Sequence, residues 1–235
     1  MPGSIFVQMP EVATSLVFRT SAERGSDLIV VGPRTRGTYH PGPALTACVR
    51  VRLRPGQARA ILGVPPDRLV NRAMGLTDLW GTPAQALEDQ LASSDGDPEL
   101  IGARLTAALN RRVAPSRPGT VELVAAAVER LTGAARLGDV AERVGLSERR
   151  LRTLFAREVG LSPKHVARIR RLRTVLALAG RQEWAAVAED AGFFDQAHMI
   201  SDFRALMGVS PAAYVQGRRP AVTPCTQLSD PRSLA

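Results

Sequence analysis

The chain has 235 residues, of which 45% are hydrophobic, enough to bury one or two cores, which excludes a disordered polypeptide. Lys and Arg number 31 against 22 Asp and Glu, a net charge of +9, and this excess favours a polyanionic partner or an anionic surface. Lys164 is the only lysine. Arg suits bidentate contacts to phosphate and guanine, although a GC-rich genome also produces such a bias.

The cysteine count and the lack of long apolar runs narrow the class of protein further. Cys48 and Cys225 are far apart and show no metal-ligand spacing or disulfide framework. The N-terminus lacks the charged start and the apolar run of a signal peptide, and no stretch approaches about eighteen apolar residues. We therefore expect a cytoplasmic protein with no metal, no cofactor and no membrane partner.

Residues 4–53 are predicted to form short β-strands. Four β-branched or aromatic runs, SIFVQM, SLVFRT, DLIVVG and ACVRVRL, are separated by Pro, Gly, Ser and Asp. In the last run apolar residues alternate with Cys48, Arg50 and Arg52, the period-two pattern of a half-buried strand. The Pro- and Gly-rich segment 33–43 is expected to be a loop with a solvated His40. These strands indicate a small β-sheet or a partial barrel.

Helices are predicted to follow the strands, so residues 1–113 are expected to form an α+β domain. They are placed over 55–64, 65–73, 82–94 and 97–113, with proline in the first turn and apolar residues at helical spacing. The apolar face of the last helix is expected to pack against the sheet or a second subunit. The segment APSRPG, residues 114–119, is the clearest linker. This half shows no Ser/His/Asp spacing, metal set or phosphate loop, so we expect no enzymatic activity.

The segment Val140–Phe155, VAERVGLSERRLRTLF, predicts a helix, a tight turn and a second helix. Gly145 allows the left-handed conformation of a turn, and Ser147 is a good N-cap for the next helix. One face of that helix is apolar, and the opposite face carries Arg149, Arg152 and Thr153. This is the layout of a helix-turn-helix DNA reader. The alternative is a solvated helix pair in an all-α domain.

The same pattern occurs a second time farther along the chain. Residues 160–163 (GLSP) return as 208–211 (GVSP), shifted by 48, and Ser147 returns at the same shift as Asp195. Before the turn the shift is 47, so the second turn carries one extra residue, Phe194. A helix beginning at Pro163 is predicted to join the two units. Agreement at this many structural positions is hard to explain by packing alone.

In these features the chain resembles the AraC/XylS family of bacterial transcription regulators. The resemblance covers about residues 120–215 and rests on VAERVGLSERRLRTLF, GLSPKHVARIRRLR, VAEDAGFFDQAHMISDFR and GVSPAAY. More loosely, GPRTR, VRLRPGQARAILGVPPDRLV and DLWG resemble the β-rich segments that precede such readers. The resemblance implies a regulatory or dimerisation domain over 1–113 and an all-α DNA-binding domain over 120–216. The latter contains two helix-turn-helix units and a linker helix, and a flexible tail follows over 217–235.

The resemblance also implies a sequence-specific transcription regulator. Its recognition helices, about 147–159 and 195–207, enter successive major-groove segments on one side of the duplex. The base-reading positions fall on Arg149, Arg152 and Thr153 in the first unit and on Gln196, Ala197, Ile200 and Ser201 in the second. The rest of the predicted DNA-binding set is Arg150, Arg157, Arg170, Arg171 and His198. Arg reads guanine and Gln reads adenine, whereas Ala and Ile touch thymine methyl groups or fill space.

Charge is distributed unequally between the two units. Residues 143–181 contain eleven Lys or Arg against two Glu, a net of +9, whereas residues 182–235 contain four against six acidic residues, a net of −2. We therefore expect the first unit and the linker helix to supply most of the attraction to phosphate. Double-stranded DNA is the expected partner and RNA polymerase a second one. A small-molecule effector of unknown identity, sensed by the N-terminal domain, and a homodimer are left open.

Two other readings remain open. One is a DNA-alkylation repair or sensor protein with a reactive Cys, for which Cys48 has Arg neighbours but no visible base partner. Thiol reactivity toward a methylated duplex distinguishes it. The other is an N-terminal module that binds another protein and no small molecule. Ligand-independent dimerisation or partner capture by residues 1–113 distinguishes that one.

Overall fold

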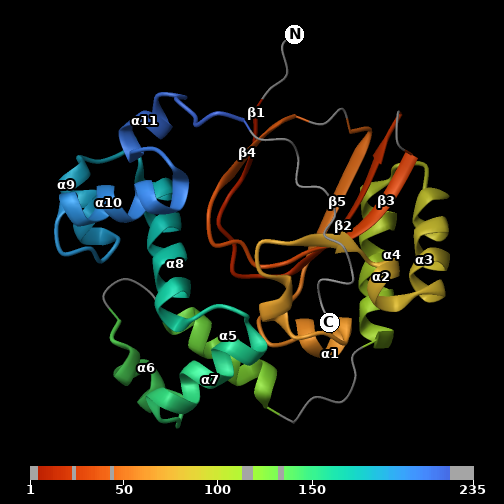
Figure 1. Cartoon of the computed structure of the whole chain (residues 1–235), viewed down its shortest axis with the longest axis horizontal. Helices are drawn as coiled ribbons and strands as arrows, with labels where there is room; N and C mark the ends of the chain where they lie inside the picture. The colour runs from red at the N-terminus through yellow and green to blue at the C-terminus, as the bar shows by residue number, and fades with distance from the viewer. Residues whose placement is uncertain (1–4, 23–24, 43–44, 113–118, 132–134, 223–235) are drawn as a thin grey trace.

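The computed structural model describes residues 5–22, 25–42, 45–112, 119–131 and 135–222. Two β-sheets with their covering helices form residues 5–112, which we call the N-terminal half, and residues 119–222 are helical, which we call the helical half (Figure 1). The predicted α+β domain followed by an all-α region is therefore confirmed. The predicted linker over 114–119 and the tail over 217–235 lie largely outside the described residues.

A four-stranded antiparallel sheet supports the N-terminal half. Its strand order is β5-β2-β3-β6. The strands are β2 (Ser15–Ser21), β3 (Gly25–Val31), β5 (Ala47–Arg52) and β6 (Ala73–Gly75). Because side chains alternate along each strand, Phe18 and Val30 point into the core under the helices. The alternation predicted for the last strand is confirmed, since Cys48, Arg50 and Arg52 are its exposed residues.

Short and long helices cover one face of this sheet (Figure 1). They are α1 (Ala58–Leu62), the 3-10 helix η1 (Pro66–Leu69), α2 (Thr77–Trp80), α3 (Thr82–Ala92) and α4 (Pro98–Arg112). The α4 helix begins where Asp97 Oδ1 accepts a hydrogen bond from the Glu99 N–H at 2.9 Å. Its apolar face, with Ile101 and Leu105, is buried against the sheet. Leu100, next to this face, stays 40% exposed.

The structure corrects two sequence-based expectations in this half. The segment expected to be a loop contains strand β4 (Thr38–Pro41), which pairs with β1 (Ile5–Gln8) in a second antiparallel sheet. His40 is therefore on a strand, 1% exposed, with its Nε2 2.9 Å from Thr38 Oγ1, and not solvated. The helix expected over 65–73 is only the 3-10 turn η1, because Asn71 takes a positive φ of 58° and β6 begins at Ala73.

The helical half contains two similar units on either side of one long helix. Its elements are α5 (Thr120–Arg130), α6 (Leu137–Arg143), α7 (Glu148–Glu158), α8 (Pro163–Leu178), α9 (Trp184–Asp190), α10 (Gln196–Met207) and α11 (Pro211–Val215). Each unit has its own core, one around Leu151 and Phe155 and the other around Met199 and Phe203. No helix in the described part of the chain is long and apolar enough to cross a membrane.

The N-terminal half packs against both units. Val12 and Val70 pack on the core of the first unit, and Tyr39 is buried within the core of the second. The Tyr39 hydroxyl donates to the Met207 carbonyl oxygen at 2.7 Å, and the Gly37 N–H donates to the Leu206 carbonyl oxygen at 2.7 Å. Two predicted domains thus share apolar cores and buried hydrogen bonds, so they pack as one body.

A buried carboxylate adds an ionic connection between the halves. Glu11 Oε2 lies 2.6 Å from Arg173 Nη2 on α8 and 3.0 Å from Arg52 Nη2 on β5. Its Oε1 accepts the N–H groups of Val12 at 2.9 Å and Ala13 at 3.2 Å. The Glu11 side chain is only 6% exposed, so both oxygens are satisfied away from water, as a buried charge requires.

Gly160, which follows the end of α7 in the first unit, lies directly against the N-terminal half. Its φ is +80°, and a Cβ there would lie 2.7 Å from the carbonyl carbon and oxygen of Pro66 in η1. Gly145, in the turn before that helix, has a similar φ of +70° but would meet nothing within 4 Å. Substituting alanine at each position therefore distinguishes two contributions to the loss of stability. Both substitutions place alanine in a left-handed conformation, but only the one at Gly160 also forces the two halves apart.

We expect Gly160→Ala to destabilise the protein more than Gly145→Ala. The left-handed conformation costs about 1–2 kcal/mol for alanine at either position, and the backbone overlap at Gly160 adds about 1–3 kcal/mol. Chemical denaturation of both variants and the parent chain measures this difference. Equal losses of unfolding free energy would show that the contact between Gly160 and η1 is not tight in solution.

Candidate nucleic-acid interface

The first unit has the geometry predicted for a helix-turn-helix. The α6 helix ends at Arg143, and in the turn after it the Gly145 N–H donates to the Glu142 carbonyl oxygen at 2.9 Å. The Leu146 N–H donates to the Ala141 carbonyl oxygen at 2.9 Å and closes the turn. Ser147 then caps α7, because its hydroxyl accepts the Arg150 N–H at 3.3 Å. The turn and cap fix the direction in which α7 leaves the core.

The outer face of α7 is exposed and basic. Its exposed predicted residues are Arg149, Arg150, Arg152, Thr153 and Arg157, while Leu151 and Phe155 on the inner face are fully buried. Arg152 forms an i,i+4 ion pair with Glu148, and the Thr153 hydroxyl donates to the Arg149 carbonyl oxygen at 3.1 Å. The pair holds Arg152 extended along the helix, but more than half of its side chain remains exposed to a ligand.

The second unit repeats the same turn. The Gly192 N–H donates to the Glu189 carbonyl oxygen at 2.8 Å, and the Phe193 N–H donates to the Ala188 carbonyl oxygen at 2.9 Å. These two bonds correspond to those of Gly145 and Leu146, so the shift of 47 predicted before the turn is confirmed in three dimensions. Asp195 then caps α10, because its Oδ1 accepts the His198 N–H at 2.7 Å.

The outer face of α10 differs chemically from that of α7. Gln196, Ala197, His198 and Ser201 are exposed and Ile200 is partly exposed. Ala197, Ile200 and Ser201 line a shallow hollow of about 520 Å³ together with Arg204 and Ala205. Arg204 was not among the predicted site residues, and its position one turn after Ile200 on the same face could have identified it. The outer face of α10 therefore mixes small apolar side chains with uncharged polar ones and carries one arginine at its edge.

Phe194 is the residue by which the second turn exceeds the first. It follows Phe193, which occupies the buried place of Leu146, and precedes the cap Asp195. Phe194 is 93% exposed, whereas Phe193 is buried, with its ring edge-to-face against His198 at 5.3 Å. A hydrophobic residue just before an N-cap often packs on the first turn of the helix, but Phe194 does not. It projects into solvent at the N-terminal end of α10.

The α8 helix joins the units and holds the second one through charge. It spans about 24 Å at 1.5 Å per residue. Arg168 Nε lies 2.7 Å from Asp202 Oδ1 on α10, and Arg171 Nη2 lies 3.6 Å from Asp202 Oδ2. The Arg171 guanidinium also covers the Phe193 ring, 4.8 Å from its centroid. The Asp202 side chain is 14% exposed, so this ion-pair group is screened little by water.

Two of the predicted DNA-binding arginines are placed away from the reading faces. Arg171 is occupied by Asp202 and Phe193, as described above. Arg170 lines a cavity between the two halves, and its Nε is buried. Burial lowers the pKa of Arg170, and the neighbouring Arg173 lowers it further, against the opposing effect of Glu129. The other ten predicted residues lie on α7 and α10 with exposed or partly exposed side chains.

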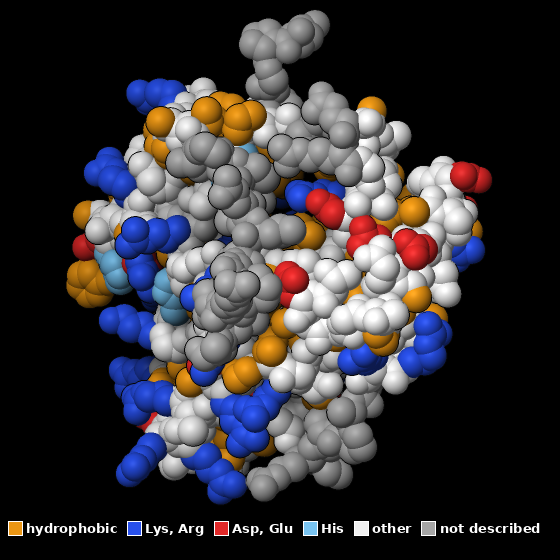
Figure 2. Space-filling view, turned by 45° about the vertical axis from the view of Figure 1, so that its right-hand side comes forward, with side chains coloured by type: hydrophobic (Ala, Val, Ile, Leu, Met, Phe, Trp, Pro, Cys, Tyr) orange, Lys and Arg blue, Asp and Glu red, His pale blue; other side chains and the backbone are white. Residues whose placement is uncertain are grey.

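Part of the positive charge of residues 143–181 is thus neutralised by ion pairs inside the protein. Arg168, Arg171 and Arg173 pair with the mostly buried carboxylates of Asp202 and Glu11. The exposed cations of this segment are Arg143, Arg149, Arg150, Arg152, Arg157, Lys164, Arg173 and Arg181. Figure 2 shows many of the visible Lys and Arg side chains along one edge of the molecule, while Asp and Glu lie mainly on the other side.

We expect Asp202→Asn to destabilise the protein, because it leaves two partly buried guanidinium groups without their anion. The loss should be about 1–3 kcal/mol of unfolding free energy, measured by denaturant titration. Glu148→Gln is the matched control, since it removes an exposed i,i+4 pair and should cost about 0.5 kcal/mol or less. A loss no larger than the control's would mean that Asp202 does not anchor α10 to α8.

This region of the chain matches a model of a known protein family. Residues 140–217 match a model described as a helix-turn-helix domain, a range that includes both turns and α8. No curated protein matches the chain.

Several solved structures are similar to this chain. The C-terminal domain of AraT, a response regulator from Geobacillus stearothermophilus, is 24% identical over 45% of this chain and 92% of its own, with a TM-score of 0.39. The DNA-binding domain of AdpA, in complex with a target DNA, is 27% identical over 42% of this chain and 90% of its own, at 0.38. ToxT from Vibrio cholerae O395 is 10% identical over 90% of this chain and 92% of its own, at 0.46.

Proposed function

Residues 140–217 are a helix-turn-helix domain of the AraC type, and on this premise we propose that the protein is a sequence-specific DNA-binding transcription regulator. The observation that carries the proposal is the repeat itself. Two turns with the same hydrogen bonds and the same kind of N-cap present α7 and α10 from one connecting helix. Both outer faces are exposed and carry the side chains that read base edges.

We assign different roles to the two recognition helices. Arg149 and Arg152 on α7 read guanine or hold phosphate, and Thr153 lies between them on the same face. On α10, Gln196 reads adenine, while Ala197 and Ile200 contact thymine methyl groups. The assignment excludes Arg171, which pairs with Asp202, and Arg170, which faces the cavity between the two halves, and it includes Arg204.

Control by the N-terminal half is the second part of the proposal. That half contacts both units, through η1 and Gly160 on one side and through Tyr39 and Met207 on the other. Any ligand or partner that shifts it changes the relative placement of the two recognition helices, which is a direct route from a signal to DNA affinity. RNA polymerase is a further partner in this proposal, and a homodimer stays open. An enzymatic role is not part of it.

The charge difference between the units leads to a measurable asymmetry. Using a duplex selected from a random library by the full chain, we expect Arg152→Ala to weaken binding by about 1–3 kcal/mol and to flatten the dependence of affinity on salt. Gln196→Ala should cost about 1 kcal/mol and leave the salt dependence unchanged, because no charge is removed. Arg111→Ala, on the exposed surface of α4, is the charge-matched control and should bind as the parent does. Equal losses for Arg152→Ala and Gln196→Ala would contradict the assigned roles.

Phe194 provides an apolar contact to DNA beside the second reading face. Phe194→Ala should weaken binding to the selected duplex by about 1–2 kcal/mol, the free energy of burying part of an aromatic ring, without altering the salt dependence. Its thermal midpoint should match the parent's, because an exposed ring supports no core. Phe193→Ala is the contrasting variant and should lower the midpoint. If Phe194→Ala binds DNA as the parent does, the ring serves another partner.

A further inference from the structure

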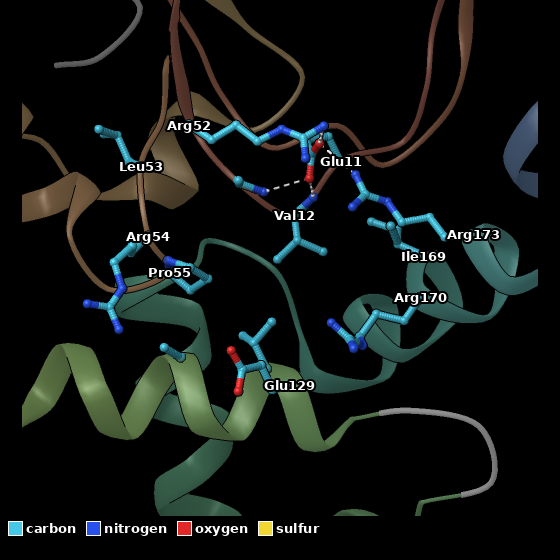
Figure 3. Close-up of a pocket in the computed structure, with 13 residues that line it drawn as sticks. Glu11, Val12, Arg52, Leu53, Arg54, Pro55, Glu129, Ile169, Arg170 and Arg173 are labelled. Atoms are coloured by element: carbon cyan, nitrogen blue, oxygen red, sulfur yellow. Dashed lines mark hydrogen bonds and ion pairs between the residues drawn. The ribbon is translucent and has the colours of Figure 1, made fainter. Parts of the chain in front are cut away.

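A cavity of about 340 Å³ lies between the two halves of the molecule (Figure 3). The segment after β1 and the end of β5 form its walls on one side, and α5 and α8 form them on the other. Its charged lining residues are Glu11, Arg52, Arg54, Glu129, Arg170 and Arg173. In Figure 3 Glu11 lies between Arg52 and Arg173 at one end, Val12 points into the space, and Glu129 lies opposite.

The charge of this lining is not balanced. Four guanidinium groups face two carboxylates, and Glu11 is already bound to Arg52 and Arg173 at 3.0 Å and 2.6 Å. Among the described residues neither Arg54 nor Arg170 forms an ion pair with Glu129, so the lining keeps a surplus of about two positive charges when every group is ionised. Polar and apolar groups both line the space, which favours a small polar ligand over a purely apolar one.

Arg170 is the clearest sign of a missing acceptor. Its Nε is buried, and the described residues provide no hydrogen-bond partner for it. The side chain extends from α8 into the cavity in Figure 3. A buried charged donor without an acceptor is costly, and proteins usually satisfy such a group with an anion or a hydrogen bond.

The excess of positive charge also affects Arg34, a buried arginine next to the cavity. Arg34 donates from its Nε to the Met9 carbonyl oxygen at 3.0 Å. Burial lowers the pKa of Arg34 to about 10, and Arg50, Arg173 and Arg52 contribute in the same direction, against the opposing effect of Glu11. The single negative charge of Glu11 therefore does not neutralise all the guanidinium groups around it.

We propose that the cavity binds a compact anion with two negative charges, either a phosphate monoester or a dicarboxylate, held by Arg170 on α8, while Arg54 at the rim adds to the positive potential of the cavity. The two charges match the surplus of the lining, and guanidinium groups bind phosphate and carboxylate through paired hydrogen bonds. Because both halves supply the walls of the cavity, the ligand contacts both halves. Binding is a property of the folded chain alone and is independent of the proposed DNA binding.

Ligand binding to the folded state raises stability by mass action, which gives a test without DNA. The full chain is heated with increasing inorganic phosphate or succinate, with sodium chloride added to keep the ionic strength constant. We expect a saturating rise in the thermal midpoint. A tighter response to phosphate identifies a phosphate ester as the ligand class, and a tighter response to succinate identifies a dicarboxylate. If the rise of the thermal midpoint does not reach a plateau with either anion, the proposal is overturned.

Two variants locate the anion, and one serves as the control. Arg170→Gln should raise the anion concentration that gives half of the maximal midpoint shift roughly tenfold or more. The variant should fold, because it removes a half-buried charge that has no acceptor. Arg54→Gln, on the exposed rim of the opposite wall, should weaken the response as well. Arg181→Gln removes an exposed cation outside the cavity and should respond as the parent chain does. A parent-like response in both Arg170→Gln and Arg54→Gln would place the anion elsewhere and overturn the proposal.

Discussion

The buried carboxylate of Glu11 is the interaction on which the arrangement of the two halves depends. Burial raises the pKa of this carboxyl, but Arg173, the Ala13 N–H and Arg52 together outweigh burial and bring the pKa below its usual value. A lowered pKa means that the ionised carboxylate stabilises the fold above the pKa of the unfolded chain, and that this stabilisation is lost as the pH falls through the folded value. One anion thus holds a strand of the N-terminal half and the connecting helix α8 together, in a region otherwise crowded with arginine.

This connection makes α8 part of both halves. On one side α8 is held through Arg173 and Glu11, and on the other through Arg168 and Asp202, so it is joined both to the N-terminal half and to α10. The N-terminal half also touches the first unit at Gly160 and the second at Met207. These contacts fix the placement of both units relative to the N-terminal half.

Local patterns accounted for much of the architecture. The N-caps Ser147 and Asp195 and the turn glycines act within a few residues, so their spacing predicts where helices begin and end. Local patterns did not predict the strands β4 and β6, because these strands form only by pairing with segments far away in the sequence. The sequence TYHP around His40 looks like a loop by composition, yet pairing with β1 supplies the backbone hydrogen bonds that local propensity does not.

What the sequence alone determined is the repeat: two helix-turn-helix units, their buried stripes and the outer faces that carry Arg149, Arg152 and Gln196. Periodicity and capping are short-range properties, and they decide which face of a helix is apolar. They do not decide what a charged side chain meets across the molecule. Only the tertiary structure assigned Arg171 to Asp202, turned Arg170 into the cavity and left Phe194 in solvent, because these outcomes depend on how segments far apart in the chain pack together.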